Sequence, residues 1–204
     1  MTAPRIEWRA GDTSKGRLEA FSDGVLAIVI TIMVLQLAPP AGTRLDDLFA
    51  LWPKFLSYGL SFANLAIYWV NHHHLLQAAR TVSGRVLWAN MLLLFFLSLI
   101  PFGTAWMGEH AFASTPVAVY DVILILPPIA YAFLVRALIA APGQPPTIAT
   151  AIGRDVKGKL SIAAYVVALP IALVVPLLAV AIYVLVAAAW IAPDPRIERA
   201  LSNS

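Results

Sequence analysis

The sequence contains no cysteine and few charged residues. Only 12% of its 204 residues are Asp, Glu, Lys or Arg, whereas 60% are hydrophobic. The absence of Cys excludes disulfide bonds, thiolate metal sites and a catalytic cysteine. A water-soluble globular domain carries about 25% charged residues, so this charge content and a mean hydropathy of +0.80 do not fit one. The composition predicts an integral membrane protein.

Apolar runs of about the length that crosses a bilayer follow one another along the chain. The last of them, Leu160 to Ala192, covers roughly 33 residues, or on the order of 50 Å as one helix, and therefore has to fold back. Pro170 and Pro176 offer the break. The predicted spans are residues 21–37, 51–71, 86–106, 117–140, 160–175 and 177–191.

The basic residues are concentrated in every second segment between the predicted spans. Of the 14 Lys and Arg residues, only Arg44 and Lys54 fall in external segments when both termini are cytoplasmic, which leaves 12 on the cytoplasmic side. The 12 are Arg5, Arg9, Lys15, Arg17, Arg80, Arg85, Arg136, Arg154, Lys157, Lys159, Arg196 and Arg199. The positive-inside rule thus favours an all-α membrane protein of six transmembrane helices with both termini cytoplasmic. Its parts are a cytoplasmic N-terminal segment (1–16), the membrane domain (17–192) and a cytoplasmic tail (193–204).

The first apolar segment is preceded by Glu19 and Asp23 and lacks a convincing Ala-x-Ala cleavage site, so we expect a retained helix rather than a signal peptide. Short loops and this retained helix are compatible with a multi-pass protein of a prokaryotic plasma membrane.

Charged residues within membrane segments are costly and are therefore functional candidates. They concentrate at the start of the first helix, where Arg17, Glu19 and Asp23 fall within seven residues. At about 100° per residue, a stripe roughly 60° wide carries Ile28, Thr31 and Leu35 on the side opposite the two carboxylates. A purely structural interpretation also exists, in which the carboxylates complement the helix N-terminus and the Arg17 side chain reaches the headgroups. In that interpretation the Thr31 hydroxyl bonds to its own helix.

Two motifs resemble those of a known family. The letters from Arg17 through Phe21-Ser22-Asp23 resemble the Arg-x-x-x-Phe-Ser-Asp first helix of the transmembrane protein 175 family, which comprises potassium channels of bacteria, archaea and animal endosomes and lysosomes. The end of the second segment, Trp69-Val-Asn-His72-His73, resembles the family's Trp-x-x-His-His pattern. Beyond about residue 86 the resemblance is limited to hydropathy and helix count.

The resemblance implies a homotetramer around a central pore that is lined by the first helix of each copy. The family's constriction residues correspond to Ile28, Thr31 and Leu35, with Ile32 adjoining. Apolar rings would form a dewetting constriction and a threonine ring would replace part of a cation's hydration, which predicts a modest preference for potassium over sodium. The expected partners are the potassium ion, the lipid bilayer and further copies of the chain. We expect no nucleic acid, cofactor, metal site or enzyme activity.

The motif residues have expected supporting roles. Phe21, Ser22 and Asp23 are expected to pack against the following helices, and Ser22 and Asp23 to accept hydrogen bonds from Trp69, Asn71, His72 and His73 at the same depth. Arg17 either lies near the pore-side stripe or bonds within the motif.

Other polar residues are expected to have less specific roles. Adjacent imidazoles on a helix point about 100° apart, so the run from His72 to His74 is predicted to form an interfacial cap rather than a metal site. Asp121, Glu109 and His110 fall at or near the external side, where solvation or capping is expected.

Three alternatives to a channel remain. A secondary or proton-coupled transporter would use Asp23, His72 and Asp121 as relay groups, although no inverted repeat is visible. A membrane-embedded enzyme is disfavoured because no Gly-x-Ser-x-Gly or His-Glu-x-x-His segment is present. A purely structural membrane protein is the third alternative.

Overall fold

The computed structural model describes residues 10–145 and 156–191 of the chain, and side chains from Lys15 onward. The described residues are helical and contain no strand. The predicted tail, 193–204, lies outside them. The helices are α1 (Ala10–Leu35), α2 (Leu45–Phe49), α3 (Trp52–Ala78), α4 (Gly84–Leu97), α5 (Ile100–Glu109), α6 (Ser114–Ile139), α8 (Val156–Val174) and α9 (Pro176–Ile191).

Four helical stretches among the described residues are long and apolar enough to cross a membrane, so the chain is a multi-pass membrane protein. They are Lys15–Leu35, Gly84–Glu109, Ser114–Ile139 and Val156–Val174. Helix α3 has the length of a span but carries two Asn and three His residues, and α9 is apolar but only 16 residues long. Six spans and cytoplasmic termini therefore stay predictions.

The ends of several helices differ from those predicted. Helix α1 begins at Ala10, within the predicted N-terminal segment, and α3 continues past Asn71 to Ala78. Both extensions are amphiphilic stretches that hydropathy alone does not mark as helix. The predicted fold-back is present at Pro176, the first residue of α9. Proline is accommodated there because the first turn of a helix does not need its backbone N–H. Pro170 lies inside α8 and does not end it.

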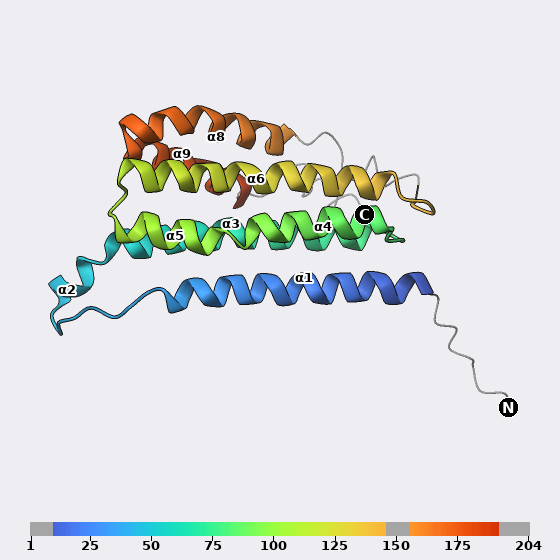
Figure 1. Cartoon of the computed structure of the whole chain (residues 1–204), viewed down its shortest axis with the longest axis horizontal. Coiled ribbons are helices and arrows are strands. Elements are labelled where there is room, and N and C mark those ends of the chain that lie inside the picture. Colours follow the sequence, from blue (N-terminus) through green and yellow to red (C-terminus); the bar gives the residue numbers. More distant parts are fainter. Residues whose placement is uncertain (1–9, 146–155, 192–204) are drawn as a thin grey trace, which may run out of the picture.

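The helices run up and down in an antiparallel bundle, with α1 along one edge and α8 beyond α6 on the opposite side (Figure 1). Helix α1 packs on α3, α4 and α5, whereas α8 packs on α6 and α9. Lys15 at the start of α1 donates to the carbonyl of Ala79 (2.9 Å), and Thr81 in the next connection donates to the carbonyl of Pro142 beyond α6 (2.6 Å). The start of α1, the α3–α4 connection and the end of α6 thus meet at one end of the bundle. This end also holds Arg80 and Arg85, and we call it the basic end.

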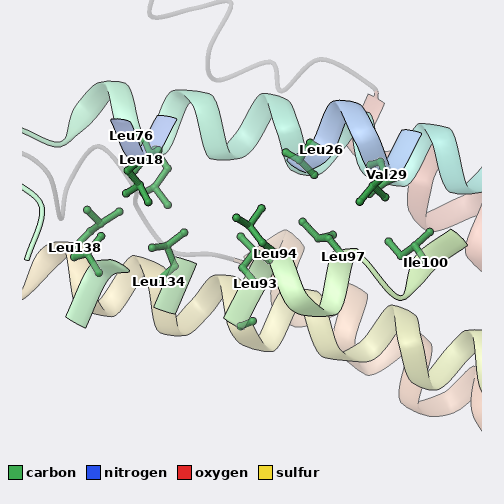
Figure 2. Close-up of a cluster of buried hydrophobic side chains, with 14 of the residues drawn as sticks. Leu18, Leu26, Val29, Leu76, Leu93, Leu94, Leu97, Ile100, Leu134 and Leu138 are labelled. Carbon is green, nitrogen blue, oxygen red and sulfur yellow. The ribbon is translucent and has the colours of Figure 1, made fainter. Parts of the chain in front are cut away.

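Two hydrophobic cores hold the bundle together. The first lies between α1, α3, α4, α5 and α6, and Figure 2 shows its leucine-rich packing. Its labelled members are Leu18, Leu26, Val29, Leu76, Leu93, Leu94, Leu97, Ile100, Leu134 and Leu138. The second core joins α6 to α8 and α9 through three tyrosines (Tyr120, Tyr165 and Tyr183) and small alanines. Small residues let neighbouring membrane helices approach closely.

Candidate functional site

Helix α1 buries one face in the first core. The buried residues recur every three or four positions, as expected for one face of a helix. They are Leu18, Ser22, Leu26, Val29 and Met33. This face contacts α3, α4 and α5 and so determines which side chains point away from the protomer.

The opposite face of α1 is exposed along its length. Ile28 is 59% exposed, Leu35 is 81% exposed, and Thr31 between them is also exposed. Ile32 adjoins this line at 43% exposure. Arg17, the first residue of the motif, is also exposed and lies on the same side of the helix. The stripe predicted from the helical wheel is thus the surface that α1 leaves uncovered in the single chain.

Thr31 is the polar member of this exposed face. Its hydroxyl donates to the carbonyl of Ile28 at 2.9 Å, which is the local bond that a structural interpretation of the residue predicts. Because the hydroxyl proton is used in this bond, the lone pairs of Oγ1 remain available to the outside of the helix. Thr31 therefore presents an oxygen acceptor on the exposed face of α1.

A chain of buried hydrogen bonds connects α1 to α3 and α4. The Asn90 amide donates to Ser22 Oγ at 2.9 Å, and its Oδ1 lies 2.7 Å from His72 Nε2. Ser22 in turn donates to the carbonyl of Leu18 (2.8 Å). All three side chains are buried. Their mutual hydrogen bonds satisfy polar atoms whose burial without a partner would be unfavourable. With Asp23 and Trp69, these residues form what we call the motif network.

The second part of the motif network lies at the surface. The Trp69 indole donates to Asp23 Oδ1 at 2.9 Å, which is the expected contact between the first helix and the end of the second segment. The Trp69 ring also stacks on His73, with ring centroids 5.6 Å apart. His73 bonds to Gln77 at 2.8 Å instead of to the motif. Ser22 accepts its hydrogen bond from Asn90 on α4 rather than from a residue of α3. The sequence thus predicted the acceptor correctly but not the donor.

The remaining motif residues lie beside a groove. Phe21 is half exposed, and with Arg17, Leu18, Leu87 and Met91 it lines a groove of about 450 Å³ between α1 and α4. The expected packing of Phe21 on the following helices is therefore only partial. Arg17 lies at the mouth of this groove and on the exposed side of α1.

The histidine run lies within α3 and does not cap it. His72 points inward to Asn90, whereas His73 and His74 are exposed. The helix continues past the run to Ala78, beyond the apolar part of the segment. His72 and His73 each form a hydrogen bond within the protein. His72 points away from the other two rings, whose centroids lie 5.9 Å apart.

Asp121 is not solvated, contrary to expectation. Its side chain is fully buried in the second core, while Glu109 and His110 are exposed as predicted. The prediction failed because Asp121 lies two turns inside α6, where α8 and α9 cover it. Sequence position near a predicted helix end did not reveal this cover.

A further polar cluster was missed by the sequence. The Thr104 hydroxyl lies 2.6 Å from Ser61 Oγ, and Ser61 Oγ lies 2.7 Å from the Tyr120 hydroxyl. We call these three side chains the hydroxyl network; it joins α5, α3 and α6 farther from the basic end. Single hydroxyls in apolar segments give little signal, whereas Asn90 within an apolar run was a recognisable candidate.

Comparisons with known proteins agree with these motifs. The family described as "Endosomal/lysosomal potassium channel TMEM175" matches residues 17–101. A protein named potassium channel from a Chryseobacterium species is 47% identical over 191 residues, which cover 94% of this chain and all of that protein.

Two further similarities extend the comparison. The human endosomal/lysosomal proton channel TMEM175 is 35% identical over 115 residues, which cover 50% of this chain and 22% of the human protein. The crystal structure of a lysosomal potassium-selective channel TMEM175 homologue from Chamaesiphon minutus superposes with a TM-score of 0.76 and 29% identity, over 87% of this chain and 96% of that one.

Proposed function

The chain belongs to the transmembrane protein 175 family, and on this premise we propose that it is a potassium channel in which the exposed face of α1 lines a pore shared by four copies. Its relatives are ion channels rather than enzymes. The residues assigned to the pore are Ile28, Thr31 and Leu35, with Ile32 adjoining. The expected setting is a prokaryotic plasma membrane.

The exposure of one continuous face of α1 is the observation that carries this proposal. The helix lies at the edge of the bundle, so the protomer cannot enclose a path along it. Several copies arranged with their α1 helices inward would enclose one, and homo-oligomers most often form closed symmetric assemblies. The groove beside Phe21 would then receive a neighbouring protomer. Native mass spectrometry of the purified protein should give a mass of four chains.

The proposed constriction combines apolar and polar rings. Ile28 and Leu35 lie one turn on either side of Thr31, so their side chains would form two apolar rings that exclude water when narrow. Between them, four Thr31 oxygens would present lone pairs, because each hydroxyl proton already bonds to Ile28. Such a ring replaces only part of a cation's hydration, which supports a modest potassium preference.

The motif network would fix the rotation of α1. Ser22 and Asp23 lie on the buried side and on the flank of the helix, where Asn90 and Trp69 hold them. A rotation of α1 that turned Leu35 away from the pore would break both bonds. We therefore assign Ser22, Asp23, Trp69 and His72 a positioning role rather than a direct role in conduction.

The transporter alternative would need a relay through Asp23, His72 and Asp121. Asp23 and His72 lie near the basic end within the motif network, whereas Asp121 belongs to the second core. Among the described residues, no hydrogen bond connects Asp121 to either of the other two. Since the human relative is named a proton channel, the conducted cation has to be tested by changing potassium and proton gradients separately.

A pair of adjacent substitutions tests the pore face. Leu35→Asn adds polar groups to an apolar ring and is expected to raise the current severalfold by wetting the constriction. Val34→Asn is the matched control, because Val34 is also exposed (46%) but points about 100° away from Leu35. Currents are compared in planar bilayers at equal protein content. Equal effects of the two substitutions on the current would contradict the assignment of Leu35 to the pore.

A second pair tests the threonine ring. Thr31→Ala removes the oxygen and is expected to reduce the preference for potassium over sodium, whereas Thr31→Ser keeps the oxygen and should retain it. The permeability ratio from reversal potentials is the measurement. A ratio that Thr31→Ala leaves unchanged would show that the selectivity arises elsewhere.

A further inference from the structure

Asp121 is a buried carboxyl group that the proposed pore does not use. Its side chain has no exposed surface, and neither carboxyl oxygen has a hydrogen-bond partner among the described residues. A buried polar group without a partner is rare and costly, and an ionised carboxylate in such a place is far more so. The environment of Asp121 therefore needs a compensating species.

Tyrosines surround the carboxyl group. Tyr120 precedes it on α6, and Tyr165 on α8 and Tyr183 on α9 interact with it electrostatically. Tyr183 is the nearby polar group across the α6–α9 contact, but its hydroxyl is not in hydrogen-bond geometry and likewise has no partner among the described residues. The three rings contact one another, with centroids 5.9 Å apart for Tyr120–Tyr183 and 6.0 Å for Tyr165–Tyr183.

Helices α4 and α5 also pack on α6, and α3 reaches it through Ser61; no described residue of these helices forms an ion pair with Asp121. Helices α3 and α5 present the hydroxyls of Ser61 and Thr104, which bond to each other and through Ser61 to Tyr120. The polar groups identified near the carboxyl group are thus uncharged hydroxyls. No described Lys or Arg forms an ion pair with it.

A small, partly open cavity adjoins the cluster on the side of the basic end. It has a volume of about 40 Å³, enough for at least one water molecule, and lies between α3, α6, α8 and α9. Its walls are mainly apolar but include the polar side chains of Asn64, Asn71, Ser161 and Trp190. Tyr165 belongs both to this lining and to the Asp121 cluster.

We propose that Asp121 is a proton-binding site inside the α6/α8/α9 part of each protomer, and that protons reach it through the cavity and past Tyr165. The ligand is a proton delivered by water: a hydronium ion gives its proton to a carboxylate oxygen and leaves as water. The bound form is the neutral carboxylic acid, which avoids the cost of an unpaired buried charge. This site is separate from the pore and does not depend on the proposed conduction.

Infrared difference spectroscopy on the purified full chain in detergent tests the binding directly. The wild-type protein at neutral pH is expected to show the carbonyl stretching band of a protonated carboxyl group. The band should disappear in Asp121→Asn, which preserves the shape of the side chain, and persist in Glu109→Gln, which removes an exposed carboxylate on the neighbouring α5. A wild-type spectrum without the band, or a band that survives in Asp121→Asn, would overturn the proposal.

The route is tested by the exchange of the bound proton for deuterium. After transfer into heavy water the band should shift in the wild-type protein, and the shift should be at least severalfold slower in Tyr165→Phe, which keeps the ring and removes the hydroxyl. Tyr58→Phe, on α3 and outside the cavity lining, is the matched control and should exchange at the wild-type rate. Equal rates in all three proteins would exclude passage past Tyr165.

Discussion

The motif network and the hydroxyl network perform similar structural tasks with different chemistry. The first joins α1 to α3 and α4 through Asn90, whose amide has two different partners. The second joins α5, α3 and α6 through hydroxyls, each able to donate and to accept. An amide bridge fixes donor and acceptor directions, whereas hydroxyls can reorient after a partner is lost. The comparison indicates that α1 is held by the more directional of the two networks.

The sharpest test of this difference is Asn90→Leu. The substitution leaves buried His72 without its partner and removes the bond to Ser22, so we expect a loss of about 1–3 kcal/mol in the free energy of unfolding. The fraction of assembled protein should also fall. Thermal unfolding in detergent gives the first quantity and size-exclusion chromatography the second. Leu92→Met, at a partly exposed position of the same helix outside the groove beside Phe21, is the control and should change neither.

The surface part of the motif network should be less sensitive. Asp23→Ala leaves the Trp69 indole unpaired at a partly exposed site, and we expect a loss of about 1 kcal/mol with reduced assembly. Asp23→Asn keeps an oxygen acceptor and should recover most of the stability. The unfolding midpoints of the two variants are compared in the same detergent. Identical losses would mean that the charge of Asp23, and not the hydrogen bond, supports α1.

The smallest effect is expected in the hydroxyl network. Tyr120→Phe removes one hydroxyl but leaves Ser61 bonded to Thr104 and the contact with the Tyr183 ring intact. Interhelical hydrogen bonds in membranes contribute about 0.6 kcal/mol on average, and a loss of that size is expected. Thermal unfolding is again the measurement. A loss as large as that of Asn90→Leu would contradict the difference drawn between the two networks.

The sequence predicted the features that repeat along a single helix. The common face of Ile28, Thr31 and Leu35 follows from helical periodicity, and the break at Pro176 follows from the length of the final apolar stretch. The contact of Asp23 with Trp69 was expected from the two motifs, which are specific in residue type and spacing. These features depend on local geometry, for which the sequence is sufficient.

Features that depend on packing between distant helices were not predicted. Asn90 lies 68 residues from Ser22 and belongs to no motif, so nothing in the sequence indicated the hydrogen bond between them. Asp121 was placed near solvent because its cover comes from α8 and α9, which are distant in the sequence. Helix ends were also missed at Ala10 and Ala78, because the terminal turns are too polar for hydropathy to mark.

Current through the purified protein in a planar bilayer, with potassium on one side and sodium on the other at equal pH, tests the central claim most directly. The account predicts unitary currents whose reversal potential is shifted toward the potassium equilibrium potential. The shift should be smaller than that of an ideally selective channel. A reversal potential that follows an imposed proton gradient and ignores potassium would contradict it. So would silence from folded, correctly inserted protein in both the wild type and Leu35→Asn.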